Sequence, residues 1–92
     1  MPMQRGVLPG SDLIEQGLDD LSRGVRSIGA LLVSIGAPRL TRLGLHVPDP
    51  FPSPERALYD LLCEAGADSA HSRYNALVRR LVSFERAAAC AK

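Results

Sequence analysis

The chain has 92 residues, no tryptophan, and only 4% aromatic residues. A core formed by this chain must therefore be built mainly from aliphatic side chains. Lysine is nearly absent as well, because ten of the eleven basic residues are arginine. Basic and acidic residues almost cancel to a net charge of +1, so the overall charge does not favour binding to nucleic acid or to a membrane surface.

Cysteine is scarce too. Cys63 and Cys90 form no Cys-x-x-Cys motif, which argues against a disulfide-stapled secreted domain. No apolar segment of the signal-peptide kind follows the N-terminal residues. The longest apolar stretch, 28–37, has about half of the roughly 20 residues that a bilayer-spanning helix needs. We therefore expect a cytoplasmic protein with no membrane partner, in which both cysteines are small apolar packing groups.

The spacing of apolar residues predicts an all-α fold, a small bundle of three main helices over about 12–37, 54–65 and 69–90. In the first helix, apolar residues recur at intervals of four and three, which is typical of a packed helix that ends before Pro38. These residues are Ile14, Leu18, Leu21, Val25, Ile28, Leu32 and Ile35. The last helix repeats the pattern with Ala70, Tyr74, Leu77, Leu81, Phe84 and Ala88. No stretch alternates with a period of two for long enough to predict a strand.

The domain organisation follows from proline and glycine. We predict a flexible N-terminal tail over 1–10 and a single helical domain over 11–92, with Gly66 separating the last two helices. Between the first two helices, 44–54 is predicted to be an extended linker, because proline at alternate positions favours polyproline II. Those prolines are Pro48, Pro50, Pro52 and Pro54. We expect Phe51, inside this linker, to pack against the bundle.

The first predicted helix carries glycine beside its apolar residues. Each glycine inside a helix costs about 1 kcal/mol relative to alanine, but small residues let a second helix approach closely. We interpret this face as a helix-association seam formed by Gly17, Leu18, Leu21, Gly24, Val25, Ile28, Gly29 and Leu32. Its partner is either the last helix of the same chain or a second protein, which includes another copy of this chain.

Charge is unevenly distributed along the C-terminal half. Residues 49–72 carry a net charge of −4 and residues 73–92 a net charge of +4. Four arginines of the last predicted helix are expected to form one stripe about 20 Å long. They are Arg73, Arg79, Arg80 and Arg86. One hypothesis is that the stripe contacts a nucleic-acid phosphate backbone, and the other is that it is a solvated face or pairs with the acidic segment.

The sequence predicts no catalytic residue, no metal site, no cofactor and no small-molecule substrate. It contains no glycine-rich phosphate loop. His46 and His71 are the only histidines, and in the predicted hairpin Cys63 and Cys90 lie roughly 30 Å apart, which disfavours a shared zinc ion. The chain is therefore predicted not to be an enzyme.

Together these features predict a non-enzymatic helical accessory subunit that acts by helix–helix association in a larger assembly. It would bind a protein partner or copies of itself, and would present its arginine stripe to nucleic acid. In size and architecture it is similar to the small helical subunits of CRISPR effector complexes, although no motif carries this resemblance. Two alternatives are a small inhibitor or antitoxin that occludes a partner protein, and a helix-turn-helix-like DNA-binding regulator with its turn at Gly66.

Overall fold

The structure, a computed structural model, describes residues 8–91. Its helices are α1 (Ser11–Ser22), α2 (Ile28–Ile35), α3 (Ala37–Arg42) and α4 (Pro54–Ala91). No strand occurs between residues 8 and 91, so the all-α prediction is confirmed. None of these helices has the length and apolar composition that crossing a bilayer requires.

The predicted continuous helix over 12–37 is wrong, because the chain turns back between α1 and α2. Gly24 adopts the left-handed conformation with φ 73°. Its N–H donates to the carbonyl of Leu21 at 3.0 Å, and the N–H of Val25 donates to the carbonyl of Asp20 at 2.8 Å. These two bonds form a Schellman motif, which ends a helix by satisfying its last carbonyls.

The start of α2 is tied to the end of α1. The hydroxyl oxygen of Ser27 accepts a hydrogen bond from the N–H of Ala30 at 3.1 Å, which caps α2. The same hydroxyl donates to Oδ2 of Asp20 at 2.7 Å. This bond, followed by smaller contributions from Gln16 and Arg23, holds the pKa of the Asp20 carboxyl below its ordinary value of 3.8. The reversal is therefore closed by specific polar contacts.

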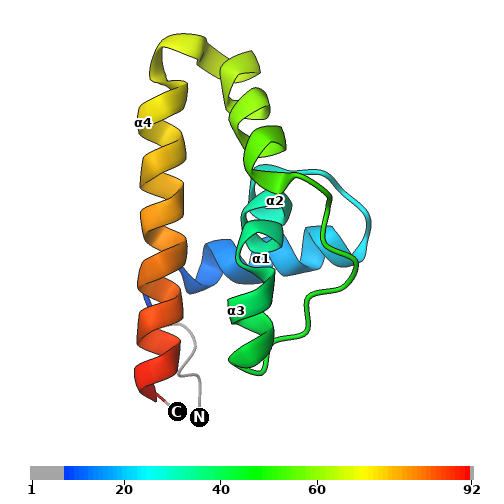
Figure 1. The fold of residues 1–92 in the computed structure, drawn as a ribbon, viewed down its shortest axis with the longest axis vertical. Helices are drawn as coiled ribbons and strands as arrows, with labels where there is room; N and C mark the ends of the chain where they lie inside the picture. The colour runs from blue at the N-terminus through cyan, green and yellow to red at the C-terminus, as the bar shows by residue number, and fades with distance from the viewer. Residues whose placement is uncertain (1–7, 92) are drawn as a thin grey trace.

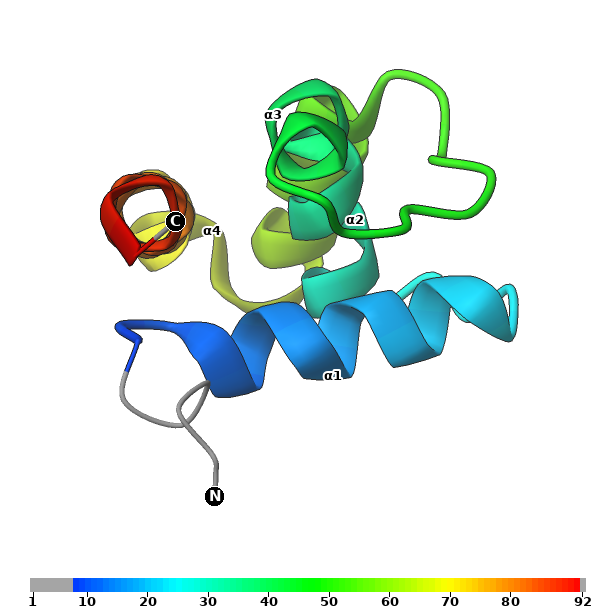
Figure 2. The same ribbon diagram turned by 90° about the horizontal axis from the view of Figure 1, so that it is seen from below.

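α2 is the central helix of the molecule. Six consecutive residues of α2, from Gly29 to Ser34, are buried. α1 lies across one side of α2, and α4 packs on another side (Figures 1 and 2). A helix that is apolar on all sides is buried on all sides, which explains why α2 does not follow the one-sided pattern predicted for a seam.

Pro38 lies in the first turn of α3. A proline there costs no hydrogen bond, because the first N–H groups of a helix have no partner within it. It also separates α3 from α2, since it cannot continue the hydrogen-bond pattern of the preceding helix. The predicted end of the first apolar helix at Pro38 therefore corresponds to a junction between two helices.

The linker predicted over 44–54 contains no helix from 44 to 53. It is not a continuous polyproline II segment, because Asp49 (φ 40°) and Ser53 (φ 47°) adopt positive φ. The N–H of Phe51 donates to the hydroxyl of Ser34 at 3.1 Å, and its half-buried ring packs against the core. The prediction that Phe51 packs against the bundle is confirmed.

α4 consists of two arms, 54–65 and 67–91, which are joined at Gly66. The backbone of Gly66 is extended (φ 170°, ψ 95°), and the arms run antiparallel to one another (Figure 1). The predicted break at Gly66 is confirmed, and the chain has two helical arms where the last two helices were expected. Tyr59 and Tyr74 meet across this hairpin, with their ring centroids 5.7 Å apart.

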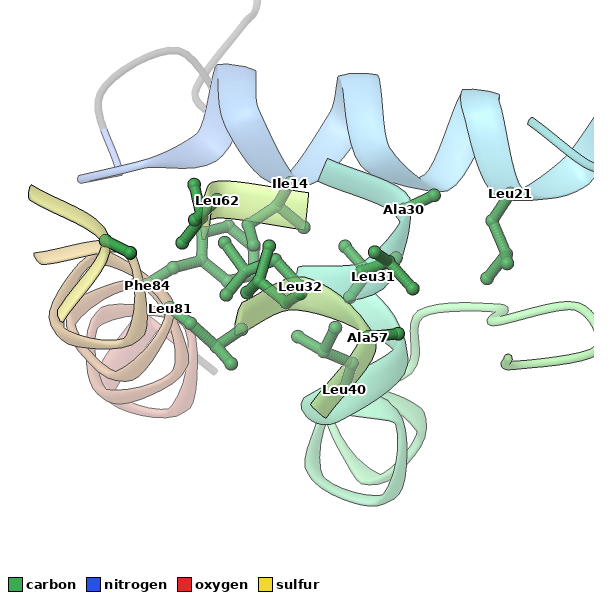
Figure 3. Close-up of a cluster of buried hydrophobic side chains, with 13 residues drawn as sticks. Ile14, Leu21, Ala30, Leu31, Leu32, Leu40, Ala57, Leu62, Leu81 and Phe84 are labelled. Atoms are coloured by element: carbon green, nitrogen blue, oxygen red, sulfur yellow. The ribbon is translucent and has the colours of Figure 1, made fainter. Parts of the chain in front are cut away.

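The core is aliphatic, as predicted, with Phe84 as its aromatic exception among the buried side chains of 8–91. Side chains from all four helices converge on it (Figure 3). The largest that are almost fully buried are Ile14, Leu31, Leu32, Val33, Leu40, Leu58 and Leu62.

The tail predicted over 1–10 falls mostly on residues 1–7, which lie outside the described range. Leu8 packs against the core, and its carbonyl accepts a hydrogen bond from the N–H of Ser11 at 3.2 Å. Gly10, with φ 76°, is the N-cap of α1. α1 therefore begins at Ser11, and the core contacts of the chain begin earlier, at Leu8.

Candidate nucleic-acid interface

The second arm of α4 separates apolar and basic side chains onto different sides. Its core side buries Ala70, Leu81 and Phe84. The four predicted arginines of the stripe are all exposed: Arg73, Arg79, Arg80 and Arg86. The helical register thus turns all four guanidinium groups away from the core, where burial of a charge would be costly.

The predicted stripe consists of two adjacent rows of these arginines. Arg73 and Arg80 are seven residues apart and lie on one side of the helix, as do Arg79 and Arg86 on another. Successive residues of an α-helix differ by about 100° around the axis, which is the angle between the two rows. The Arg79–Arg86 row lies on the side farthest from the buried residues.

Arg80 of the Arg73–Arg80 row lies beside α1. Nη2 of Arg80 lies 3.7 Å from Oδ1 of Asp12, whose side chain is 91% exposed. An exposed pair of this kind contributes at most about 1 kcal/mol. No carboxylate of the described chain lies within 4.0 Å of the guanidinium groups of Arg73, Arg79 and Arg86.

The acidic segment 49–72 does not neutralise the second arm. Within residues 8–91, no ion pair joins the two arms of α4. Arg56 and Asp60 are 4.0 Å apart, but both belong to the first arm. The sequence left two alternatives to a phosphate contact, a solvated face and pairing with the acidic segment. In the described chain the arginines lie on a solvated face, and no pairing across the hairpin occurs.

The residues of the predicted association seam do not share one face. Gly17, Leu18 and Leu21 belong to α1, whereas Ile28, Gly29 and Leu32 belong to α2. Gly24 and Val25 lie in the reversal between the helices, where the Val25 side chain is 46% exposed. The seam was predicted on the assumption of one continuous helix, which the Schellman motif at Gly24 interrupts.

Two glycines of that seam meet one another inside the molecule. A Cβ atom on Gly17 would overlap the carbonyl oxygen of Gly29, and one on Gly29 would lie 3.0 Å from the Cα of Gly17. α1 and α2 therefore cross with their backbones in contact. The close approach predicted from glycine does occur, but the partner is the other half of the helix predicted over 12–37 and not the last helix.

Comparison with protein-family models, with curated proteins and with solved structures found no match. What this chain binds must therefore be inferred from its own side chains.

The cysteines and histidines of the described chain are scattered over the linker and α4. Cys63 is half-buried against the core, as expected of a packing group, but Cys90 is exposed, so that prediction is wrong for Cys90. Among the described residues of α4, Ala88 is the last that packs against the core, and Cys90 follows it. His46 and His71 are exposed, and in the described part of the chain no three His, Cys, Asp or Glu side chains are grouped as metal ligands.

The sequence analysis missed a contact between α3 and α4. Glu85 of α4 is buried, with a side chain only 8% exposed, and its Oε1 accepts a hydrogen bond from Nη1 of Arg39 at 3.4 Å. The sequence held one signal that Glu85 is exceptional, because it is the only acidic residue within 73–92. Its role depends on the packing of α2 on α4, which brings Arg39 of α3 within reach and which no local pattern predicts.

Proposed function

We propose that the protein is a non-enzymatic helical subunit that contacts the phosphate backbone of a nucleic-acid duplex through the second arm of α4. The observation that carries this proposal is the exposure of Arg73, Arg79 and Arg86 with no carboxylate of the described chain within 4.0 Å. A cluster of like charges that is left unpaired on one helix repels itself. An anionic partner would remove that repulsion.

The spacing of the arginines suits a phosphate backbone. Arg79 and Arg86 are separated by two helical turns, or about 10.5 Å. Along a duplex each strand carries one phosphate per 3.4 Å of axis, so this row reaches across about three phosphates. Guanidinium is planar and donates bidentate hydrogen bonds to phosphate oxygens, which favours Arg over Lys for such contacts.

The remaining residues of the outer face favour backbone contact over base stacking. Ser72, Asn75, Ala76 and Ser83 are exposed beside the arginines. None of them is aromatic, whereas proteins that bind single strands stack bases on aromatic rings. A duplex whose phosphates face the arm is therefore the better partner, and we expect little dependence on base sequence.

A salt titration tests the proposal. Binding of the full chain to a 24-base-pair DNA duplex would be measured by fluorescence anisotropy between 50 and 200 mM salt. Each neutralised phosphate contributes about −0.9 to the slope of log K against log salt, so three contacts give a slope near −2.7. The Arg79→Gln/Arg86→Gln variant should reduce the magnitude of that slope by about 2.

The matched control is Arg26→Gln/Arg56→Gln, which makes the same charge change at exposed residues outside the second arm. It should leave the slope near its wild-type value. The proposal is wrong if the duplex does not bind at 50 mM salt, or if the two double variants lower affinity equally.

Two of the earlier hypotheses receive no support from specific residues. The arms of α4 run side by side as an antiparallel pair, whereas the helices of a DNA-reading helix-turn-helix meet at about 90–120°. Self-association through the predicted seam would require Gly17 and Gly29, which are buried against each other. We therefore propose neither.

A further inference from the structure

A groove runs between α3 and the second arm of α4. Two neighbouring cavities of about 300 and 230 Å³ lie there, and Arg39 and Glu85 line both of them. At the junction of α2 and α3 the backbone lies close to α4, because a Cβ on Gly36 would be 2.9 Å from Cδ1 of Leu81. Beyond that contact the second cavity separates Arg42 and Leu43, at the end of α3, from Ala89 of α4.

Both walls of the groove are largely apolar. The α4 wall includes Val78, Val82 and Ala89, which lie on one side of the helix because they are four and seven residues apart. The opposite wall is formed by Ile35, Pro38 and Leu43. The α4 wall is about 16 Å long, since each residue adds 1.5 Å, and it would accommodate about three turns of a docked helix.

The rim of this groove is positively charged. Arg39 and Arg42 project from α3, and the Arg39 side chain is 69% exposed. Among the described residues that line the groove, Glu85 is the only one with a carboxylate, and it is buried and bonded to Arg39. On the described lining, an incoming chain therefore meets apolar walls and guanidinium groups, while the carboxylate of Glu85 is buried.

A second hollow of the molecule has a different character. A cavity of about 390 Å³ between the α1–α2 reversal and the first arm of α4 is lined by Arg26 together with Asp60 and Glu64. Because this cavity carries charges of both signs, it does not favour a partner of either net charge. The α3–α4 groove differs because its walls are apolar and the exposed charges of its described lining, Arg39 and Arg42, are both positive.

From these features we infer that the α3–α4 groove binds an acidic amphipathic helix of a partner protein. The apolar face of such a helix would cover the valines of α4, and its carboxylates would pair with Arg39 and Arg42. Complementary charge at the rim sets the orientation and excludes basic competitors. This inference does not depend on the phosphate contact proposed for the Arg79–Arg86 row.

Other occupants fit less well. The described chain has no sheet edge to which a strand could be added, and the groove has no aromatic residue to hold a polyproline segment. A phosphate backbone would match the arginines but leave the apolar walls uncovered. A second copy could offer acidic α1, but the apolar side of α1 is already buried at Ile14, Gly17 and Leu21.

A peptide selection on the immobilised full chain tests this inference. The probe is a display library of 18-residue helical peptides whose apolar residues recur at alternating intervals of three and four. At the other positions Glu, Lys, Gln and Ser occur with equal frequency. We expect the enriched peptides to carry more Glu than Lys. Exchanging Glu for Lys in the best peptide should raise its Kd at least tenfold.

Variants place the peptide in the groove. Arg39→Gln/Arg42→Gln should raise Kd at least tenfold, whereas Arg26→Gln/Arg56→Gln, with the same charge change at another cavity, should change it less than twofold. Because Arg39 also bonds the buried Glu85, thermal melts would check folding, and Val82→Glu on the opposite wall provides a second variant that should weaken binding similarly.

Several outcomes would overturn the inference. The selection could enrich no peptide, or it could enrich peptides with no excess of Glu over Lys. The groove variants could also leave the Kd of the peptide unchanged. Sedimentation velocity of the protein alone tests a further outcome. If the protein is a dimer and Val82→Glu dissociates it, the occupant of the groove is a second copy of the chain. A loss of duplex binding without a loss of peptide binding in Arg39→Gln/Arg42→Gln would assign the groove to nucleic acid.

Discussion

The two sides of the central segment α2–α3 differ in how closely a neighbouring helix approaches. On one side α1 crosses α2 with backbone in contact with backbone, because Gly17 and Gly29 carry no side chains. On the other side α3 and the second arm of α4 stand apart around an open groove that Arg39 and Glu85 line. The first side is closed to any partner, and the second remains accessible.

This difference shows that small residues in this chain serve its own stability. The glycines that suggested an external helix partner allow α1 to cross α2 within one molecule. The surfaces that remain for partners are instead marked by arginine, on α3 and on the second arm of α4. The contrast can be tested by adding one methyl group at each kind of contact.

The largest effect is expected at the closed side. In Gly17→Ala the new Cβ meets the Gly29 carbonyl, and backbone cannot move aside cheaply. We expect the free energy of unfolding to fall by about 2–3 kcal/mol, even though alanine is the better helix former. Urea denaturation would measure this fall.

Gly24→Ala is the matched control for Gly17→Ala. Gly24 has no atom within 4 Å of an added Cβ, but its φ of 73° disfavours other residues. We expect a loss of about 1 kcal/mol. If Gly17→Ala costs no more than Gly24→Ala, the close backbone crossing of α1 and α2 is wrong.

A smaller effect is expected where α2 and α3 meet α4. In Gly36→Ala the added Cβ would lie 2.9 Å from Oε2 of Glu85 and from Cδ1 of Leu81, and both atoms are at the ends of side chains that can rotate. We expect a loss of about 1 kcal/mol, since side chains adapt where backbone does not. A loss as large as that of Gly17→Ala would mean that both sides are equally rigid.

The smallest effect concerns the polar link that closes the reversal between α1 and α2. Since the folded pKa of Asp20 is below the ordinary value of 3.8, its carboxylate stabilises the protein above that value. This contribution is lost as the pH falls through the folded pKa. We expect Asp20→Asn to be less stable than wild type near neutral pH and the difference to shrink below about pH 4.

Urea denaturation between pH 3 and 7 would measure that difference. Asp19→Asn is the control, because the Asp19 side chain is 59% exposed and makes no bond to Ser27. A difference between wild type and Asp20→Asn that is constant down to pH 3 would contradict the role given to the Asp20 carboxylate.

Local signals in the sequence predicted part of the fold correctly. The break at Gly66, the helix-free linker and the buried positions of the second arm at Leu81 and Phe84 all agree with the structure. The error over 12–37 arose because a regular spacing of apolar residues was weighed above two local signals. Gly24 followed by Ser27 is a helix stop followed by a helix cap, and together they end α1 and start α2.

The candidate sites were predictable to different degrees. The exposure of Arg79 and Arg86 follows from the helical period, which places the apolar residues of the second arm on the opposite side. The groove could not be predicted, because Arg39 and Glu85 are 46 positions apart and meet only through the packing of α2 on α4. A single sequence has no local pattern that reports a contact at this separation.

By itself, the sequence determined that the chain is helical and has an aliphatic core, and it held the signals for where the helices begin and end. Those properties depend on bonds and conformations within a few residues, such as the cap at Ser27 and the positive φ of Gly24. Only the tertiary structure decided that Gly17 faces Gly29 and that α3 stands apart from α4. The physical reason is that these contacts depend on how helices cross, and that is set by the shape of the whole core.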